Sequence, residues 1–460
     1  MVTFANWARV FKGQSQRGAA FCRQAIPPDL VDSACAVAGH RWRRCFWTPT
    51  RTLWTFLMQV LHPDCSCRAA VAMALAEQAA EGADSPMSAD PSAYSQARGR
   101  LRTDVLRHCL HATAQTVRDA VGDGYLWFGR RVWLVDGTRC SMPDTPSLQR
   151  AFGQPDGQHP GCGFPVATLT ALFCWASGAV LDVAIGPYRD SELRLWRRLW
   201  NWLRPGDVIV GDRFYCTYTD LAGLVRRGCD AVCRLHQRRK VDWRAGRKLG
   251  PNDRLVRWER PAKHTRGHNV SVRQWRQLPQ TLPVRLVRGI VGAPGFRTRE
   301  MIVATTLLDP AAYPAADILA LYGDRWTVEL RLRDIKTTLG MNILRGKSPS
   351  MVRKEIYMHL LAYNLIRQMM VRAATEYGRD LHRLSFAGAV QHLDAALPYL
   401  HLYAGTAHAR RLAELVLRWI AHDTVPDRPG RIEPRARKRR PKKYALLNKP
   451  RQQLRKELVS

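Results

Sequence analysis

Acidic residues are scarce in this chain of 460 residues, which has 38 Asp and Glu against 72 Lys and Arg. The net charge of +34 exceeds what solubility requires, and its self-repulsion opposes folding. Such an excess indicates a polyanionic partner, most simply nucleic acid; a ribosome-like protein or a membrane-surface binder is the alternative. Hydrophobic residues make up 46% of the chain, which excludes a disordered basic protein.

Cysteine is absent after Cys233, and the earlier cysteines form no repeated pair with zinc-ribbon spacing. The nearest approaches are Cys65-x-Cys67 and Cys229-x3-Cys233-x2-His236, and neither has a second half. The N-terminus lacks the shape of a signal peptide. We therefore expect reduced cysteines in a cytoplasmic protein of the bacterial nucleoid, without a zinc site.

Long apolar runs are also missing, with one exception between Val166 and Gly186. This run contains Asp182 and a central Ser177-Gly178 pair, which is typical of a turn. A buried β-hairpin is expected there rather than a membrane span, and no membrane association is predicted.

The first 125 residues favour helices. Thr48-Pro49 precedes an apolar helical face, and a further helix is expected from about Asp90, with Arg98, Arg100 and Arg102 along it. Small helices ending in an arginine-bearing member are typical of DNA readers. A helical packing domain with merely solvated arginines is the alternative.

From about residue 130 the pattern changes to strands, helix and strand, which predicts an α/β fold with a mixed sheet. A basic, turn-rich stretch between 236 and 300 predicts an inserted β subdomain. An apolar strand over 301–308 follows, and helices are expected from about 314 and over 355–370.

Two aspartates follow short apolar strands. We expect Asp136 and Asp212 each to end its strand at the carboxyl edge of the sheet, where open α/β sheets bind ligands. Together with Glu329 they would supply three hard oxygen ligands, the type that Mg²⁺ or Mn²⁺ prefers. Two such ions can activate a nucleophile and stabilise a leaving oxygen at a phosphodiester. Taken singly, either aspartate could equally be a turn residue.

A second group of polar residues, Tyr322, Arg325, Glu329 and Lys336, is separated by two, three and six residues. On one α-helix these residues would fall within an arc of roughly 60°. The arrangement predicts a site in which Arg325 and Lys336 neutralise phosphates beside a metal-binding Glu329. Gly323 lies inside this segment and could kink the helix.

The C-terminal region carries a run of cations that cannot pack in a core and is expected to bind phosphates: Arg435, Arg437, Lys438, Arg439, Arg440, Lys442 and Lys443.

These motifs carry a resemblance. Asp136-Gly137-Thr138, Gly211-Asp212-Arg213-Phe214-Tyr215 and the Tyr-x2-Arg-x3-Glu-x6-Lys signature resemble the DDE transposases of the insertion sequence 4 family. Thr305-Thr306-Leu307-Leu308-Asp309 and the basic tail are similar as well, so that the resemblance covers roughly residues 130–450.

The resemblance implies an RNase H-like catalytic core, which is a mixed sheet flanked by helices. The whole chain is then expected to have five parts: a helical N-terminal domain (1–125), two core segments (126–235 and 301–400), a β-rich insertion (236–300) and a C-terminal helix with a basic tail (401–460). Asp136, Asp212 and Glu329 would be catalytic residues that bind two Mg²⁺ or Mn²⁺ ions, and Tyr322, Arg325 and Lys336 would hold DNA phosphates.

The implied activity is cleavage at the ends of an insertion sequence and strand transfer of the 3′-OH into target DNA, by at least a homodimer. Some relatives hold a flipped base with an aromatic residue of the insertion. Trp243, Trp258 and Trp275 are candidates here, although each suits a local core equally well. A DNA-binding protein without transposition, or an RNase H-like nuclease without strand transfer, remains an alternative.

Overall fold

The computed structural model describes residues 26–43, 45–62, 64–80, 88–122, 126–264, 270–291, 299–403, 406–426 and 445–459. Packing divides the chain into two compact units. The first comprises the described residues up to 124, a short segment at 177–182, and residues 332–425. The second comprises 125–176, 183–331 and the described residues after 425. None of the described helices is long and apolar enough to cross a membrane.

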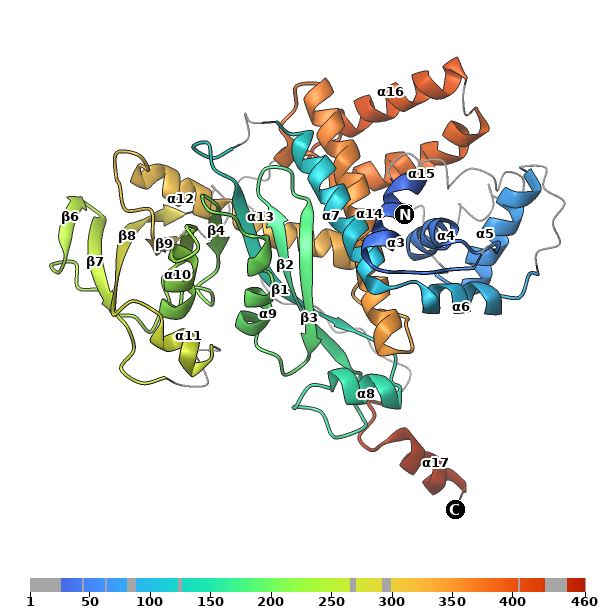
Figure 1. The fold of residues 1–460 in the computed structure, drawn as a ribbon, viewed down its shortest axis with the longest axis horizontal. Coiled ribbons are helices and arrows are strands. Elements are labelled where there is room, and N and C mark those ends of the chain that lie inside the picture. Colours follow the sequence, from blue (N-terminus) through green and yellow to red (C-terminus); the bar gives the residue numbers. More distant parts are fainter. Residues whose placement is uncertain are drawn as a thin grey trace. The chain divides into compact units, whose positions relative to one another are not determined.

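Helices build the first unit. Its N-terminal helices are α3 (Pro28–Val37), α4 (Pro49–Leu61), α5 (Cys67–Ala80), α6 (Ser92–Arg100) and α7 (Thr103–Asp119). Its C-terminal helices are α14 (Pro349–Glu376), α15 (Phe386–Leu402) and α16 (Ala407–His422), with a 3₁₀ turn at Leu381–Arg383. The long α14 packs against α4, α7, α15 and α16 and forms the centre of this unit (Figure 1).

Local sequence explains several helix starts. Thr48, predicted from the sequence to precede a helix, caps α4 by accepting the Arg51 N–H at 3.2 Å, and Pro49 occupies the first turn. Ser348 caps α14 in the same way through the Met351 N–H. Both helices therefore begin where a side-chain oxygen satisfies a backbone donor that the helix leaves unpaired.

A nine-stranded mixed sheet dominates the second unit, with the order β3-β2-β1-β4-β5-β9-β8-β7-β6. Its strands are β1 (Val132–Ser141), β2 (Val166–Cys174), β3 (Val180–Pro187), β4 (Val208–Gly211), β5 (Asp230–Arg234), β6 (Arg247–Gly250), β7 (Asp253–Glu259), β8 (Thr281–Val291) and β9 (Arg299–Thr305). The predicted hairpin at 166–186 is confirmed as β2 and β3.

Within this sheet, β4 is parallel to β1 and to β5, whereas β2 is antiparallel to β1. The predicted mixed α/β sheet is therefore confirmed. The described strands of the insertion form no separate sheet. They extend the common sheet, because β9 pairs with β5 and then carries β8, β7 and β6 in antiparallel succession.

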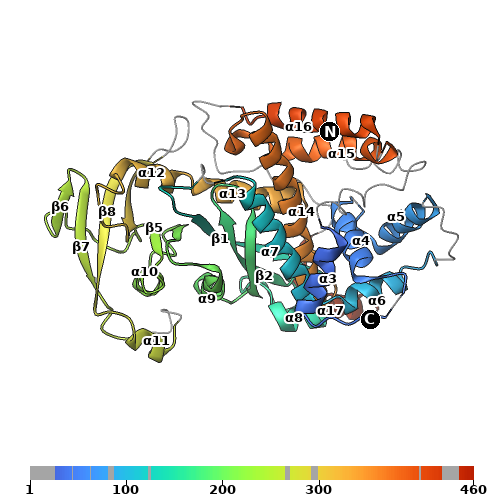
Figure 2. The same ribbon diagram turned by 45° about the horizontal axis from the view of Figure 1, so that its top comes forward.

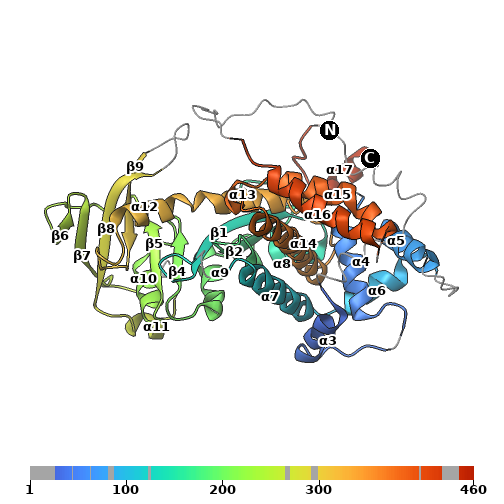
Figure 3. The same ribbon diagram turned by 90° about the horizontal axis from the view of Figure 1, so that it is seen from above.

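Short helices accompany the sheet: α8 (Pro146–Phe152), α9 (Glu192–Arg198), α10 (Tyr218–Val225), α11 (Val272–Arg276), α12 (Ala315–Gly323), α13 (Trp326–Arg333) and α17 (Arg451–Val459), with a 3₁₀ turn at Trp200–Trp202. α9 packs against β2, α10 against β5, and α12 against β5, β8 and β9. Viewed along the sheet, α9 and α10 lie on one face and α12 and α13 on the other (Figures 2 and 3).

Candidate active site

Asp136 lies in the middle of β1, which runs on to Ser141, and not at the end of a strand as the sequence predicted. The prediction was wrong because the apolar run marks only the part of β1 that has neighbours on both sides. β4 accompanies β1 as far as Leu134, opposite Val210, whereas β2 accompanies it to Ser141. Beyond Leu134 no described strand pairs with this edge of β1, and polar residues such as Asp136 and Thr138 appear in the strand.

Asp212 directly follows the end of β4, as predicted. Since β1 and β4 are parallel and Leu134 pairs with Val210, both aspartates lie two residues further along adjacent strands. This register places Asp136 and Asp212 side by side where β4 stops. The Asp212 carboxylate accepts the backbone N–H of Phe214 at 2.5 Å, which fixes one of its oxygens.

Glu329 comes from α13, in the first turn of that helix. Its carboxylate accepts a hydrogen bond from the Arg325 guanidinium at 3.1 Å, and about half of the side chain (47%) is exposed. Glu329, Asp136 and Asp212 all belong to the second unit.

The electrostatics of Asp136 show that the two other carboxylates act on it. Burial, the largest cause, and the negative charges of Asp212 and Glu329 together raise the pKa of Asp136 to about 6. The Gly137 N–H, which donates to the Asp136 carboxylate at 2.8 Å, and the positive charge of Arg325 lower this pKa. Three acids that repel one another in a partly buried site need a counter-charge when all are ionised.

The signature segment is not the single α-helix assumed in the sequence analysis. α12 ends at Gly323, α13 begins at Trp326, and Asp334–Thr338 forms a π-helical turn. The break at Gly323 confirms the predicted kink. The angular positions expected on one regular α-helix therefore do not apply. The prediction that the four residues lie within one narrow arc of a single helix is wrong.

Burial separates the members of the signature. Tyr322 is 2% exposed, and burial raises its pKa to about 12. Arg325 is 6% exposed and lies over the rings of Tyr322 and Trp326, at 5.9 and 4.6 Å from their centres. Lys336, half-buried in the π-helical turn, belongs to the first unit, whereas the other signature residues belong to the second.

Two residues near the aspartates were given no role in the site by the sequence analysis: Glu192, the first residue of α9, and Tyr215, three positions after Asp212. The signal that could have revealed Glu192 is Gly137, because a glycine inside a strand often marks the close approach of another group. The sequence analysis treated Asp136-Gly137 as a possible turn instead.

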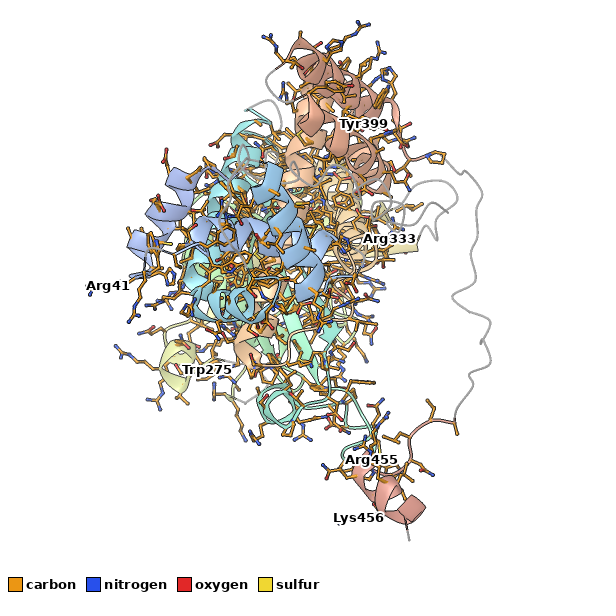
Figure 4. The ribbon with its side chains drawn as sticks, turned by 90° about the vertical axis from the view of Figure 1, so that its right-hand side faces the viewer. Arg41, Trp275, Arg333, Tyr399, Arg455 and Lys456 are labelled. Carbon is orange, nitrogen blue, oxygen red and sulfur yellow. The ribbon has the colours of Figure 1, made fainter. Side chains whose placement is uncertain are left out.

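The tryptophans of the insertion take part in local packing, each beneath an arginine. The pairs are Arg288 over Trp243 at 4.7 Å, Arg239 over Trp258 at 3.7 Å and Arg260 over Trp275 at 4.5 Å. Trp258 is buried, and the other two are half-buried (Trp275 is labelled in Figure 4). The predicted phosphate-binding tail residues Arg437, Lys438, Arg439 and Arg440 lie outside the described residues.

Two curated proteins are similar to this chain in sequence. The chain is 28% identical over 367 residues, 78% of its length and 79% of the relative's, to the transposase InsG for insertion sequence element IS4 of Escherichia coli K12. It is 27% identical over 143 residues, 30% of this chain and 47% of the relative, to the putative transposase InsZ of the same organism.

Among solved structures, the cryo-EM structure of a piggyBac transposase synaptic complex with hairpin DNA matches with a TM-score of 0.41 and 11% identity. The match covers 89% of this chain and 86% of that one. The model of the family "Transposase DDE domain" matches residues 127–365, more than half of the chain, including Asp136, Asp212 and Glu329. The chain therefore belongs to the DDE transposases, a class of enzymes that cleave and transfer DNA.

Proposed function

We propose that this transposase cleaves DNA at the ends of an insertion sequence and transfers the freed 3′-OH into target DNA. The observation that carries the proposal is the meeting of Asp136 and Asp212 at the end of β4, with Glu329 close enough to raise the pKa of Asp136. Two residues from parallel strands and one from a helix would thus contribute to one acidic site.

Divalent cations fit this set of donors. Asp136, Asp212 and Glu329 offer only carboxylate oxygens, which are the ligands of Mg²⁺ and Mn²⁺. Among the described residues no three His, Cys, Asp or Glu side chains are yet arranged around a common point for a metal. A cation bound by these carboxylates would offset the repulsion between their negative charges. Two bound ions would supply a metal-bound nucleophile and charge stabilisation of the leaving oxygen.

The protein's own residues then hold the reacting groups. Arg325 donates to Glu329 and so holds one oxygen of this carboxylate in place. The Gly137 and Phe214 backbone N–H groups do the same for Asp136 and Asp212. These hydrogen bonds fix one oxygen of each carboxylate and leave the other free to bind a cation.

We further propose that Arg325 and Lys336 hold DNA phosphates near the cleaved end. The buried Nε of Arg325 has no hydrogen-bond partner in the described residues, which leaves a donor of the guanidinium unused. Tyr322 is too deeply buried for a phosphate contact, and its ring lies beneath the Arg325 guanidinium. We therefore propose that Tyr322 packs against Arg325 and holds it in position.

The wider organisation follows the same proposal. The order β3-β2-β1-β4-β5, with β4 and β5 parallel to β1, supports an RNase H-like core in residues 126–235 and 301–400, interrupted by the 236–300 insertion.

We propose that the helices of residues 1–125 and the basic 401–460 segment bind DNA. In the latter, Arg455 and Lys456 lie on α17 (Figure 4). Two transposon ends require at least a homodimer, acting at the bacterial nucleoid in the cytoplasm.

The test uses the purified protein, DNA carrying the ends of its own element, and Mg²⁺ or Mn²⁺. Wild type should release cleaved ends and form strand-transfer products, and Glu329→Gln should abolish both without weakening DNA binding. Glu300→Gln is a matched control, because Glu300 is exposed on β9 and pairs only with Arg288 among the described ion pairs. Full activity of Glu329→Gln would refute the assignment, and cleavage without strand transfer would reduce the function to that of a nuclease.

A further inference from the structure

Glu192 places a fourth carboxylate next to the proposed cation site. It is the first residue of α9, and its backbone carbonyl accepts the Thr170 hydroxyl of β2 at 3.5 Å. Thr170 is the pairing partner of Gly137 in β1. The start of α9 is thereby held over the strand pair that contains Asp136.

The fit between Glu192 and Gly137 is close. A Cβ atom added at Gly137 would lie 2.4 Å from Cδ of Glu192 and 2.6 and 2.7 Å from its two carboxylate oxygens. Any other residue at position 137 would therefore displace this carboxylate. The glycine after Asp136 is explained by the need to admit Glu192 against the backbone of β1.

Tyr215 points its hydroxyl into the same place. The side chain is 3% exposed and is held between Gly211, where an added Cβ would lie 3.1 Å from its ring, and Trp196, whose ring is edge-on at 6.2 Å. Trp196 lies one turn after Glu192 on α9. The Tyr215 hydroxyl has no partner of good hydrogen-bonding geometry, although it is near enough to Glu192 to lower the pKa of that carboxyl.

The charges around Tyr215 define the cluster. The carboxylates that act on its hydroxyl are chiefly those of Glu192, Asp136 and Asp212. Burial raises the pKa of Glu192, and the negative charge of Asp212 raises it further, while Arg139 lowers it. Glu192, Asp136 and Asp212 are therefore all close enough to act on the same phenol.

The position of α9 explains how this is possible. α9, whose first residue is Glu192, and α13, which contains Glu329, lie on opposite faces of the sheet (Figures 2 and 3). β4 ends at Gly211, and past this point no strand separates the two faces next to β1. Acids from both faces can therefore meet around Asp212.

We propose that Glu192 is a fourth acidic residue of the catalytic site, which contributes a carboxylate oxygen to the divalent cation bound by Asp212, with the Tyr215 hydroxyl as a donor within the same cluster. The proposal rests on the proposed cation site and extends it. It explains why position 137 is a glycine and why the buried Tyr215 phenol lies among carboxylates.

The experiment measures Mn²⁺ binding directly on the full-length protein without DNA, by titration calorimetry and by the electron paramagnetic resonance signal of free Mn²⁺. Glu192→Gln keeps the size of the side chain and removes one negative oxygen. It should raise the Kd for Mn²⁺ by roughly tenfold or more. Glu300→Gln, the exposed control on β9, should leave the Kd unchanged.

Gly137→Ala is the second variant, because it keeps the Glu192 carboxylate but pushes it away from β1. It should raise the Kd in the same direction, and combining it with Glu192→Gln should add little, since both act on one carboxylate. Circular dichroism checks that each variant is folded.

An unchanged Kd in folded Glu192→Gln would overturn the proposal, as would an equal rise in Glu300→Gln. Asp212→Asn separates this failure from that of the proposed function. If Asp212→Asn abolishes Mn²⁺ binding and Glu192→Gln does not affect it, only the fourth carboxylate is refuted. If neither variant affects binding, the cation site itself is misassigned.

Discussion

Replacing Asp136 with Asn should make the cation-free protein more stable while it abolishes activity. Asp136 is half-buried beside two other acids, and these surroundings raise its pKa from 3.8 to about 6. A rise of this size corresponds to about 3 kcal/mol by which the folded state disfavours the ionised carboxylate. The site therefore holds an unfavourable charge in the absence of a cation.

The sign of the pH dependence follows from this pKa. A carboxyl group whose pKa is higher in the folded than in the unfolded protein binds its proton more tightly when folded. Its destabilising effect is complete above about pH 6 and disappears as the pH falls toward 4. Asn, which has nearly the same shape and no charge, should therefore stabilise the protein by about 1–3 kcal/mol at pH 8 and by almost nothing at pH 4.

The assay is urea unfolding of wild type and Asp136→Asn at pH 8 and pH 4, followed by circular dichroism, with EDTA present. A second series with Mn²⁺ at about 100 times its Kd should stabilise wild type by about 2.7 kcal/mol and leave Asp136→Asn unaffected. Equal or lower stability of Asp136→Asn at pH 8 would refute the reasoning that mutual repulsion and burial hold the carboxylate in an unfavourable state.

Three further outcomes follow from the structure and the sequence. Arg285 is fully buried against Asp253, so Arg285→Met should lower the free energy of unfolding in urea by about 3–5 kcal/mol. Adding Asp253→Leu should restore most of this stability, because no unpaired charge then remains buried. If the double variant is as unstable as the single one, the loss does not come from the broken ion pair. Asp182 is fully buried beside Arg107. Burial alone would raise the pKa of Asp182, but hydrogen bonds and positive charge from His111 and Arg107 lower it below its usual value. Asp182→Asn should therefore cost about 2 kcal/mol at pH 7, a loss that shrinks below pH 4 in a pH series of unfolding curves. Deleting the residues after 431 should flatten the slope of log DNA affinity against log salt, and an unchanged slope would mean that the tail contacts no phosphate.

Local signals were sufficient to predict much of the fold. Thr48-Pro49 fixed the start of α4 because capping and proline geometry act within one turn. Ser177-Gly178 marked the turn between β2 and β3 because Gly178 adopts a positive φ of 76°. Asp212 could be placed because β4 is buried on both faces and ends where its apolar run ends.

Other features depend on contacts between residues far apart in sequence. Asp136 was misplaced because the extent of β1 depends on β2, whose pairing with it no local pattern shows. The insertion could not be predicted to extend the core sheet, since β9 pairs with β5 across about seventy residues. Glu192 was missed because a glutamate at a helix N-terminus is ordinarily explained by the helix dipole alone.

The most direct test of the account is a crystal structure of the protein with Mn²⁺ and a cleaved transposon end, with the ions located by anomalous scattering. The account predicts Mn²⁺ within about 2.2 Å of oxygens from Asp136, Asp212 and Glu329. Mn²⁺ bound elsewhere, or a DNA-bound site in which these three carboxylates share no ion, would contradict it.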